Sequence, residues 1–434
     1  MKPDAHLPVD EYARKHPVLQ YPGETRMLDH LPQLDGIRAI AIVAVMWSHF
    51  MPREYVFRGT PPWGAIGVGM FFTLSGFLIT RILLNARLKI EDKKVGFWVI
   101  LKQFYVRRFL RIFPLYYAVL AVLWVTNATA FRDRAAYSLL YLTNYRFSYE
   151  EPVYIERVFR RWFMGATQKK LNTIHWDQAA TMLERHLWSL SVEEQFYIFW
   201  PFLILLCPRV LLLPMMLLTV AAGPVWRTYT YERGLFIHEW MTPGCLDLLG
   251  MGAILALLSL PRYNLTRWRD GFVQVCGLIG VPALIALVAQ RWWPTVMIKD
   301  VATAVSFDWP DYGSATYPVT ALASVWLVGM AAHGFRGPIG WFLTCAPVVY
   351  VGRISYGLYV VHMLVAHLLG VLFPDTLGDH TRQSWLHFFA SVFASLAVAS
   401  LSWFLLEAPI NRLKRYFEYE RTDATKSATP AAAA

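Results

Sequence analysis

Long runs of apolar residues recur along this chain, and they constrain its fold more than any other feature. A helix needs about 20 mostly apolar residues to cross a bilayer. Ten segments approach or meet this requirement: 36–51 with its flanks, 64–84, 109–125, 188–207, 210–226, 241–260, 271–292, 316–333, 348–373 and 385–406. The sequence therefore predicts an all-α integral membrane protein, a polytopic bundle of about ten transmembrane helices.

The composition agrees with a membrane protein. Of the 434 residues, 56% are hydrophobic and only 16% are charged, whereas a soluble domain carries about 25% charged residues. A soluble globular enzyme, a disordered chain and a disulfide scaffold are therefore excluded. An eleventh apolar segment, 135–145, is too short to cross and is expected to be re-entrant or interfacial. If it does span, the later spans must be recounted.

The distribution of lysine and arginine predicts the orientation. Residues 87–111 contain eight basic residues against Glu91 and Asp92. Basic residues favour cytoplasmic loops, so this segment and both termini are expected inside. The basic loop 261–270 also falls inside, and the acidic loop around Asp300 falls outside. The long loop 126–187 fits poorly, because it falls outside although it carries several basic residues.

These predictions divide the chain into three parts. Residues 1–33 form a polar cytoplasmic segment, 34–407 the transmembrane domain, and 408–434 a basic and then alanine-rich cytoplasmic tail. The four cysteines lie in or beside apolar stretches without metal-ligand spacing, so free thiols and no metal site are expected. No Walker loop, no Gly-x-Ser-x-Gly turn around Ser75 and no aromatic-basic platform is present. ATP-driven transport, serine hydrolysis and nucleic-acid binding therefore have no support.

Ionisable residues inside the apolar runs are the best candidates for function, because a charge within a bilayer is costly. In the first run, Arg38 precedes His49 by eleven residues. That separation is about 16 Å and close to three helical turns, so both side chains share one face. Arg38 is expected near the cytoplasmic end and His49 toward the outer half.

Three arginines open the third run: Arg107, Arg108 and Arg111. Guanidinium groups at a membrane entrance suit phosphate or carboxylate ligands. The alternative is simple anchoring to lipid headgroups at the cytoplasmic surface.

The densest polar group is 186–197, which contains Glu193 and Glu194. Glu193 shares a helical face with Tyr197, and Glu194 points about 100° away, so one glutamate is expected to face a site. The alternative is a structural ion pair within the bundle. Farther on, Tyr359 precedes His362 by three residues, close enough for the two to meet; a histidine satisfied by a backbone carbonyl is an equally good interpretation.

Taken in order, these elements resemble the membrane-bound acyltransferase-3 family of bacterial O-acyltransferases. The resemblance rests on Arg38 with His49 and on four motifs, and it covers about residues 30 to 410. The motifs are FFTLSGF at 71–77, RRFLRIFPLY at 107–116, WSLSVEEQFY at 188–197 and ISYGLYVVH at 354–362. Each motif alone is weak, but together and in register they are strong evidence.

The resemblance implies transfer of an acyl group, commonly acetyl, from cytoplasmic acyl-CoA. The acceptor is usually a hydroxyl of a lipid-linked or exported glycan, and sometimes a small metabolite. It also implies a location in the bacterial plasma (inner) membrane, contact with membrane lipids and partnership with other polysaccharide-export proteins. Some members carry a C-terminal esterase-like domain, and the chain is expected to be the stand-alone form.

The same resemblance, combined with the chemistry of the residues, predicts their roles. His49 is the expected general base, because a neutral imidazole can take a proton from an acceptor hydroxyl. Glu193 is expected to orient His49 or stabilise its imidazolium, and Arg38, Arg107, Arg108 and Arg111 to hold the CoA phosphates. The residues expected along the acyl or acceptor path are Tyr116, Gln195, Tyr197, Tyr359 and His362. Ser75 and Gly76 are expected to allow close helix packing. Direct transfer and an acyl-enzyme both remain open.

The competing hypothesis is a proton-coupled secondary transporter of a small polar solute or acylated glycan. Buried histidine, glutamate and arginine are also what a proton relay needs. Against a transporter, no pair of similarly interrupted half-spans indicates an internal repeat. The arginines also lie at a span entrance and not midway. A receptor without turnover leaves His49 and Glu193 unexplained.

Overall fold

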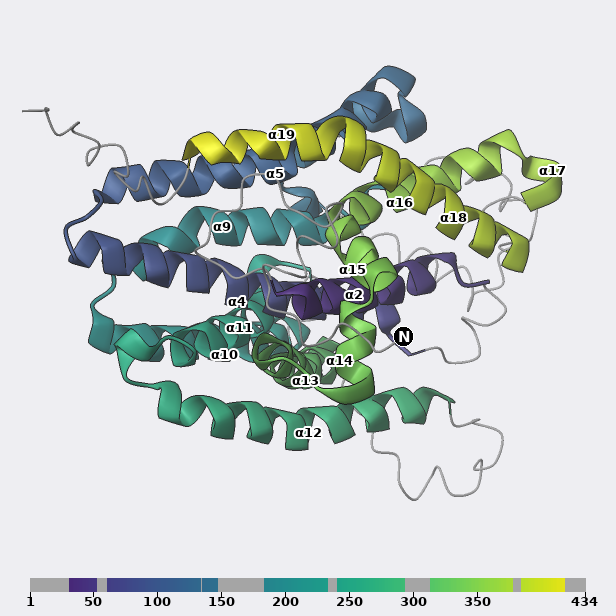
Figure 1. The fold of residues 1–434 in the computed structure, drawn as a ribbon. Coiled ribbons are helices and arrows are strands. Elements are labelled where there is room, and N and C mark those ends of the chain that lie inside the picture. The colour runs from purple at the N-terminus through teal and green to yellow at the C-terminus, as the bar shows by residue number, and fades with distance from the viewer. Residues whose placement is uncertain are drawn as a thin grey trace, which may run out of the picture.

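The computed structural model describes residues 31–52, 61–133, 135–146, 183–232, 240–292, 313–377 and 384–417. Every regular element in these ranges is a helix (Figure 1), which confirms the all-α prediction. The principal helices are α2 (Pro32–Phe50), α4 (Trp63–Glu91), α5 (Phe97–Thr126), α9 (Trp188–Leu206), α10 (Arg209–Glu232), α11 (Leu246–Leu258), α12 (Thr266–Trp292), α13 (Gly313–His333), α15 (Ala346–Arg353), α16 (Ser355–Leu372) and α18 (Trp385–Ser402).

Short elements connect the principal helices. They are η2 (Ala128–Asp133), α6 (Ala135–Leu139), η4 (Thr242–Cys245), η5 (Pro261–Tyr263), α14 (Gly337–Thr344), α17 (Pro374–Leu377), the π-helical turn η6 (Trp403–Glu407), α19 (Ala408–Arg412) and η7 (Leu413–Phe417). Each of the ten apolar segments predicted to span coincides with one or two of these helices. Seven helices in the described ranges are individually long and apolar enough to cross a membrane.

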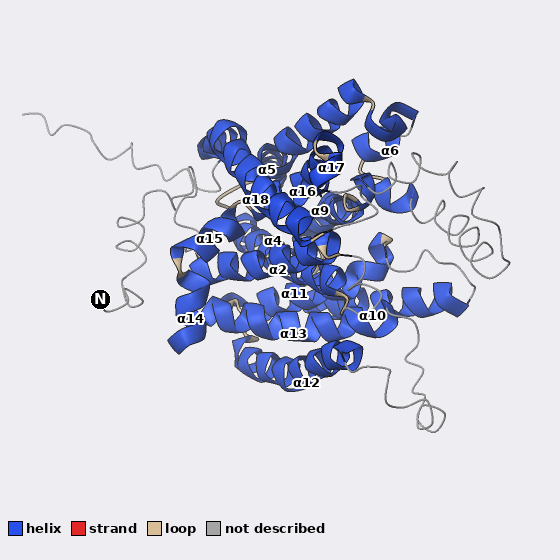
Figure 2. Ribbon diagram, turned by 90° about the vertical axis from the view of Figure 1, so that its right-hand side faces the viewer, coloured by secondary structure: helices blue, strands red, loops and turns tan. Residues whose placement is uncertain are grey.

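The other three predicted spans are α2, α9 and α11, of which the first two carry ionisable residues within their apolar runs and the third is short. α2 contains Asp35, Arg38 and His49, and α9 contains Glu193 and Glu194. α11 together with η4 reaches only from Thr242 to Leu258. α11 is buried from Asp247 onward, whereas α2 and α9 are buried on one side only, since Val43 on α2 and Phe199 on α9 are more than half exposed. The three helices lie near the middle of the bundle (Figure 2). Asp35 on α2 and Glu194 on α9 are buried, away from these exposed apolar residues.

α4 runs through the centre of the bundle, with α2, α9, α11 and α13 packed around it. Small residues allow the closest of these contacts. A Cβ added at Gly76 of α4 would overlap the backbone oxygen of Leu249 on α11, and one added at Gly252 would overlap that of Thr73. Glycines that bring two backbones together are the usual means of helix association in membranes. The packing role expected for Gly76 is confirmed.

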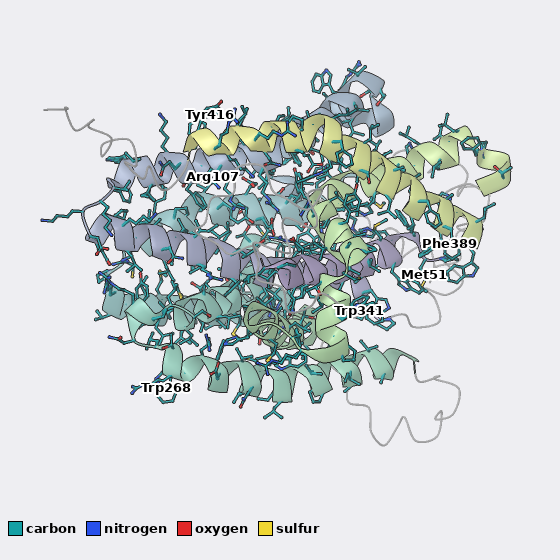
Figure 3. The ribbon with its side chains drawn as sticks, viewed as in Figure 1. Met51, Arg107, Trp268, Trp341, Phe389 and Tyr416 are labelled. Atoms are coloured by element: carbon teal, nitrogen blue, oxygen red, sulfur yellow. The ribbon has the colours of Figure 1, made fainter. Side chains whose placement is uncertain are left out.

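The outer helices expose apolar side chains. Val125 on α5, Leu218 on α10 and Leu278 on α12 are each more than 70% exposed. Trp268, Trp341 and Phe389 also lie on the outside of the bundle (Figure 3). An apolar surface of this extent is typical of a protein surrounded by lipid.

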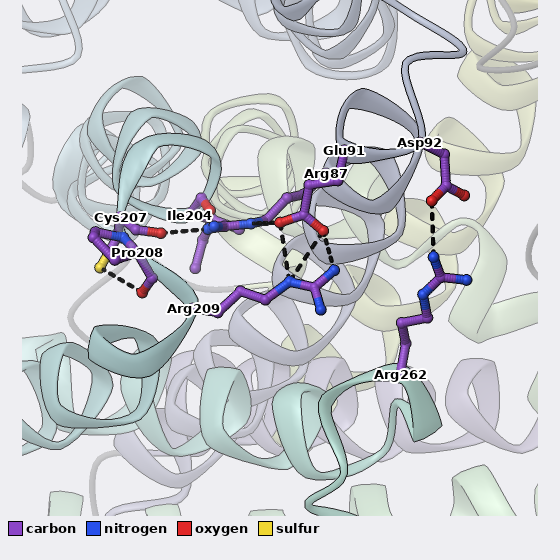
Figure 4. Close-up of polar contacts among 8 residues, drawn as sticks. All are labelled: Arg87, Glu91, Asp92, Ile204, Cys207, Pro208, Arg209 and Arg262. Atoms are coloured by element: carbon purple, nitrogen blue, oxygen red, sulfur yellow. Dashed lines mark hydrogen bonds and ion pairs between the residues drawn. The ribbon is translucent and has the colours of Figure 1, made fainter.

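Basic segments gather at one end of the bundle. Arg262 of η5 donates to Asp92, just after α4, at 2.8 Å. Beside this pair, Arg87 and Arg209 both donate to Glu91, and Arg87 also donates to the carbonyls of Ile204 (2.7 Å) and Cys207 (2.5 Å) at the end of α9 (Figure 4). We call this group, Arg87, Glu91, Asp92, Arg209 and Arg262, the basic-end clamp. Segments 87–111 and 261–270, which are predicted to share one side of the membrane, therefore meet at one end of the molecule.

One predicted span differs in detail. The expected span 348–373 is broken at Ile354 into α15 and α16, and α14 and α15 run across the direction of the long helices (Figure 1). A Cβ at Gly352 would overlap the backbone oxygen of Asp35, so α15 is pressed against α2 where the helix breaks. Segment 135–145 contains the short helix α6 and a further helical turn that begins at residue 143, and neither is long enough to cross a membrane, in agreement with the preferred prediction. The acidic loop 300–311 and residues 147–182 lie outside the described ranges.

Candidate active site

A cavity of about 200 Å³ lies between α2, α4, α5, α9 and the start of α16. Its charged lining consists of Asp35, Arg38, Arg81, Arg108, Arg111 and Glu193. Hydroxyl groups of Ser75, Ser189, Ser355, Tyr197, Tyr356 and Tyr359 also line it, and the remaining lining is apolar. The cavity therefore combines four guanidinium groups with two carboxyl groups in a largely hydrophobic bundle.

The arginines of the cavity come from three different helices. Arg38 of α2 donates to Asp35 one turn earlier at 2.5 Å, which holds its guanidinium at the wall. Arg108 of α5 lies 5.8 Å above the ring of Tyr197, and Arg81 of α4 lies 6.0 Å above that of Phe77. Aromatic faces are favourable supports for guanidinium groups. With four arginines and two acidic residues, the cavity suits an anion with several charges.

Glu193 connects two hydroxyl groups in the cavity. The Ser75 hydroxyl donates to one carboxyl oxygen at 2.7 Å, and the Tyr197 hydroxyl donates to the other at 3.1 Å. Glu194 does not line the cavity but lies buried on another side of α9. Only one of the two adjacent glutamates faces the site, as the helical geometry predicts.

A group of three histidines lies near the other end of α2. The Nδ1 of His49 is 2.7 Å from the Nε2 of His362, and the two rings stack with their centroids 5.0 Å apart. The ring of His186 meets that of His362 edge-on at 4.9 Å. His362 is fully buried, whereas His49 is partly exposed. We call His49, His186 and His362 the histidine cluster.

Tyr359 lies between the cavity and the histidine cluster. It lines the cavity, and its ring centroid is 5.5 Å from that of His186 and 5.8 Å from that of His362. Its hydroxyl contacts Ser189 and the backbone oxygen of His186, both at 2.6 Å. One aromatic ring therefore separates the arginines from the histidines.

The comparisons with known proteins agree with this geometry. The model of a family described as an acyltransferase domain matches residues 31–404. The chain belongs to this acyltransferase family. No solved structure matches the chain.

Relatives of the chain include longer bacterial proteins. The chain is 25% identical over 400 residues to the peptidoglycan O-acetyltransferase OatA of Listeria monocytogenes, covering 88% of this chain and 56% of that protein. A putative O-acetyltransferase of Staphylococcus aureus strain COL is 26% identical, with coverages of 89% and 58%. The putative peptidoglycan O-acetyltransferase YrhL of Bacillus subtilis is 26% identical, with coverages of 88% and 55%. The chain thus spans little more than half the length of these relatives.

The fold brings most of the predicted site residues to two places. Arg38, Arg108, Arg111, Glu193, Tyr197 and Tyr359 line the cavity, and His49 and His362 meet in the histidine cluster. Arg107 is not among the lining residues, because its guanidinium donates to the backbone oxygens of Lys414 (3.0 Å) and Phe417 (3.2 Å) beneath the C-terminal helices (Figure 3).

Tyr116 and Gln195 also lie away from the cavity. The Tyr116 hydroxyl donates to the Ser138 backbone oxygen at 2.8 Å, and its ring stacks on Tyr141 at 4.4 Å. The Gln195 amide donates to the Tyr141 backbone oxygen at 2.8 Å and to Asn144 at 3.0 Å. These contacts hold segment 135–146 against α5 and α9.

One predicted contact is wrong, and two site residues were missed. His49 is hydrogen-bonded to His362, whereas both oxygens of Glu193 are bonded to Ser75 and Tyr197, so Glu193 does not orient His49 through a hydrogen bond of its own. Arg81 was missed although it is an ionisable residue within an apolar run, the signal used for the others. His186 stood in the polar group 186–197, but nothing in the sequence placed it beside His362.

Proposed function

We propose that this protein is a membrane-bound O-acyltransferase that moves an acyl group, most simply acetyl, from cytoplasmic acyl-CoA to a hydroxyl of a glycan. The observation that carries the proposal is the cavity with four arginines, one aromatic ring away from a histidine cluster. Membership of the acyltransferase family supports the reaction class. The names of the relatives support an O-linked glycan acceptor, for which peptidoglycan is the first candidate.

The cavity is proposed as the donor site. CoA carries several phosphate charges, and Arg38, Arg81, Arg108 and Arg111 offer guanidinium groups from three directions. Guanidinium groups bind phosphate by paired, charge-assisted hydrogen bonds. We place the end with the basic-end clamp on the cytoplasmic side of the plasma membrane, since that end is rich in arginine and lysine. CoA then enters from the cytoplasm, and both termini face it.

Catalysis is assigned to the histidine cluster. In the simplest route, His49 takes the proton of the acceptor hydroxyl while the hydroxyl oxygen attacks the thioester carbonyl carbon of the acyl-CoA. A C–O bond forms, the C–S bond breaks, and the departing CoA sulfur takes the proton back from His49. Glu193 is proposed to hold the hydroxyls of Ser75 and Tyr197 toward the acyl group, and Tyr359 to border its path.

Binding of acetyl-CoA to detergent-purified protein tests the donor site. We expect the midpoint of thermal unfolding to rise with acetyl-CoA concentration, because a ligand that binds only the folded state stabilises it. Arg108→Gln removes a cavity guanidinium and should weaken binding at least about tenfold, which corresponds to about 1.4 kcal/mol. Arg107→Gln, one residue away but outside the cavity, is the matched control and should bind like the unmodified protein. Equal binding by all three would contradict the assignment. No binding of any acyl-CoA would favour the transporter.

A further inference from the structure

The orientation of the His362 ring is set by its own helix. Its Nδ1 lies 2.7 Å from the backbone oxygen of Tyr359 and 3.1 Å from that of Leu358. A carbonyl oxygen can only accept a hydrogen bond. The Nδ1 of His362 therefore carries a hydrogen and donates it, and in the neutral ring the Nε2 then carries the lone pair.

The position of the hydrogen on His362 determines the position of the hydrogen on His49. The Nε2 of His362, as an acceptor, faces the Nδ1 of His49 at 2.7 Å, so the Nδ1 of His49 must be the donor. A neutral imidazole has a hydrogen on only one nitrogen. The Nε2 of His49 is consequently the nitrogen with the lone pair. Two backbone carbonyls of α16 thus determine the tautomer of a histidine on α2.

We propose that His362 is a positioning residue that fixes the tautomer of His49, so that Nε2 of His49 is the atom that accepts the proton in acyl transfer. The proposal rests on the proposed function, and it replaces a role for His362 along the substrate path. During transfer, the acceptor proton moves to the Nε2 of His49, and the Nδ1 hydrogen stays bonded to His362. The same proton then leaves from Nε2 to the CoA sulfur, so His362 gains and loses none.

The other groups around His49 make different contacts from those of His362. His186 packs edge-on against His362 and has its Nε2 3.3 Å from the backbone oxygen of Val360. The Tyr359 hydroxyl is directed to Ser189 and the His186 backbone. Of these neighbours, His362 is the one in hydrogen-bond contact with the His49 ring in the described residues.

Two substitutions at position 362 distinguish positioning from packing. His362→Leu fills the site without an acceptor, and we expect kcat to fall about 100-fold or more, the contribution typical of a well-placed base. The KM for acetyl-CoA should stay unchanged, because the cavity is untouched. His362→Gln places an amide oxygen where it can accept from the Nδ1 of His49, and should keep kcat within about tenfold of the unmodified protein. His367→Leu, on the same helix, is the control and should change neither constant.

Nitrogen NMR of ring-15N-labelled histidine reads the tautomer directly, with the His49 signals assigned by comparison with His49→Gln. We expect Nδ1 of His49 to be protonated and Nε2 unprotonated in the unmodified protein and in His362→Gln, with this preference lost in His362→Leu. Protonation of His49 at Nε2 in the unmodified protein, or a His362→Leu protein with unchanged kcat and spectrum, would overturn the inference. If His362→Leu does not fold, the unmodified protein and His362→Gln still decide. The NMR spectrum does not depend on turnover. A protein that transfers no acyl group would therefore disprove the proposed function, while its spectrum would still show the tautomer of His49.

Discussion

Glu193 and Glu194 are neighbours in the chain, but their surroundings differ. Both oxygens of Glu193 accept hydrogen bonds from hydroxyls that line the cavity. Glu194 is buried, and in the described residues its Oε1 has no hydrogen-bond partner. A buried oxygen without a partner destabilises the fold, whereas one that accepts two hydroxyls organises a site.

Substitution by glutamine should separate these two glutamates. Glu193→Gln replaces one acceptor oxygen by a donor NH₂, so either Ser75 or Tyr197 loses its acceptor, and we expect kcat to fall about tenfold to 100-fold. Glu194→Gln removes a carboxyl group from an apolar environment and should leave kcat unchanged with equal or higher thermal stability. Steady-state transfer and thermal unfolding in detergent measure both effects. Near-normal turnover of Glu193→Gln would reduce Glu193 to a structural residue.

Sequence reasoning at this scale succeeded where one helix contains the whole argument. The spacing of Arg38 and His49, and the opposite directions of Glu193 and Glu194, follow from 3.6 residues per turn. Sequence reasoning failed where the hydrogen-bond partner of a residue lies on a helix that is distant in the chain. Arg107 is bonded to the C-terminal segment more than 300 residues later, and the His49–His362 pair is separated by 313 residues. Helical periodicity carries no information about such contacts.

At the scale of elements, the basic-end clamp joins the ends of α4, α9 and α10. The Arg87 side chain is 9% exposed and donates to two carbonyls at the C-terminal end of α9, where helix geometry leaves such groups without partners. Arg209 is 44% exposed and contacts only Glu91 among the clamp residues. The buried arginine therefore serves as a cap for a neighbouring helix, and the exposed one as a surface ion pair.

We expect the two arginines to contribute unequally to stability. Arg87→Met leaves the α9 carbonyls and Glu91 without their buried donor and should lower the free energy of unfolding by about 3 kcal/mol. Arg209→Met, the matched control, removes a solvent-screened pair and should cost at most about 1 kcal/mol. Thermal or denaturant unfolding in detergent compares them. Equal effects would mean that Arg87 acts only as a partner of Glu91.

The sequence predicted the long helices well and their interruptions poorly. Apolar length alone located ten segments that are helical in the structure, because a chain within lipid must satisfy its backbone internally, and seven helices in the described ranges are long and apolar enough to cross a membrane. The break at Ile354 has no proline to announce it, and the polar residues beside it, Arg353 and Ser355, do not by themselves indicate that a helix ends there. It arises where Gly352 is pressed against the backbone of α2, which is a tertiary contact. The break matters for the site, since it places Ser355 and Tyr356 on the cavity wall.

At the scale of the whole molecule, the two ends of the bundle differ in chemistry. Lys93 follows α4 at the basic end, whereas Met51 follows α2 at the opposite end (Figure 3). α4 alone, with 29 residues, is about 43 Å long, enough to cross the bilayer. The proposed orientation puts Lys93 in the cytoplasm and Met51 outside.

Cysteine labelling in intact cells tests this orientation. In a background in which the four native cysteines are replaced, Met51→Cys should react with a membrane-impermeant maleimide. Lys93→Cys should react only after the cells are opened, because the reagent cannot reach the cytoplasmic side. The reverse pattern would place the arginine cavity away from cytoplasmic CoA and would contradict the proposed donor.

The position of Tyr359 has a consequence for the membrane itself. An enzyme that joins an internal donor to an external acceptor needs access from both sides, and a continuous aqueous passage would short-circuit the ion gradients of the cell. Here the ring of Tyr359 is buried between the cavity and the histidine cluster, and its hydroxyl is hydrogen-bonded to Ser189 and to the backbone oxygen of His186. On the proposed function and orientation, this partition would let an acyl group pass from one compartment to the other while the bilayer stays electrically insulating.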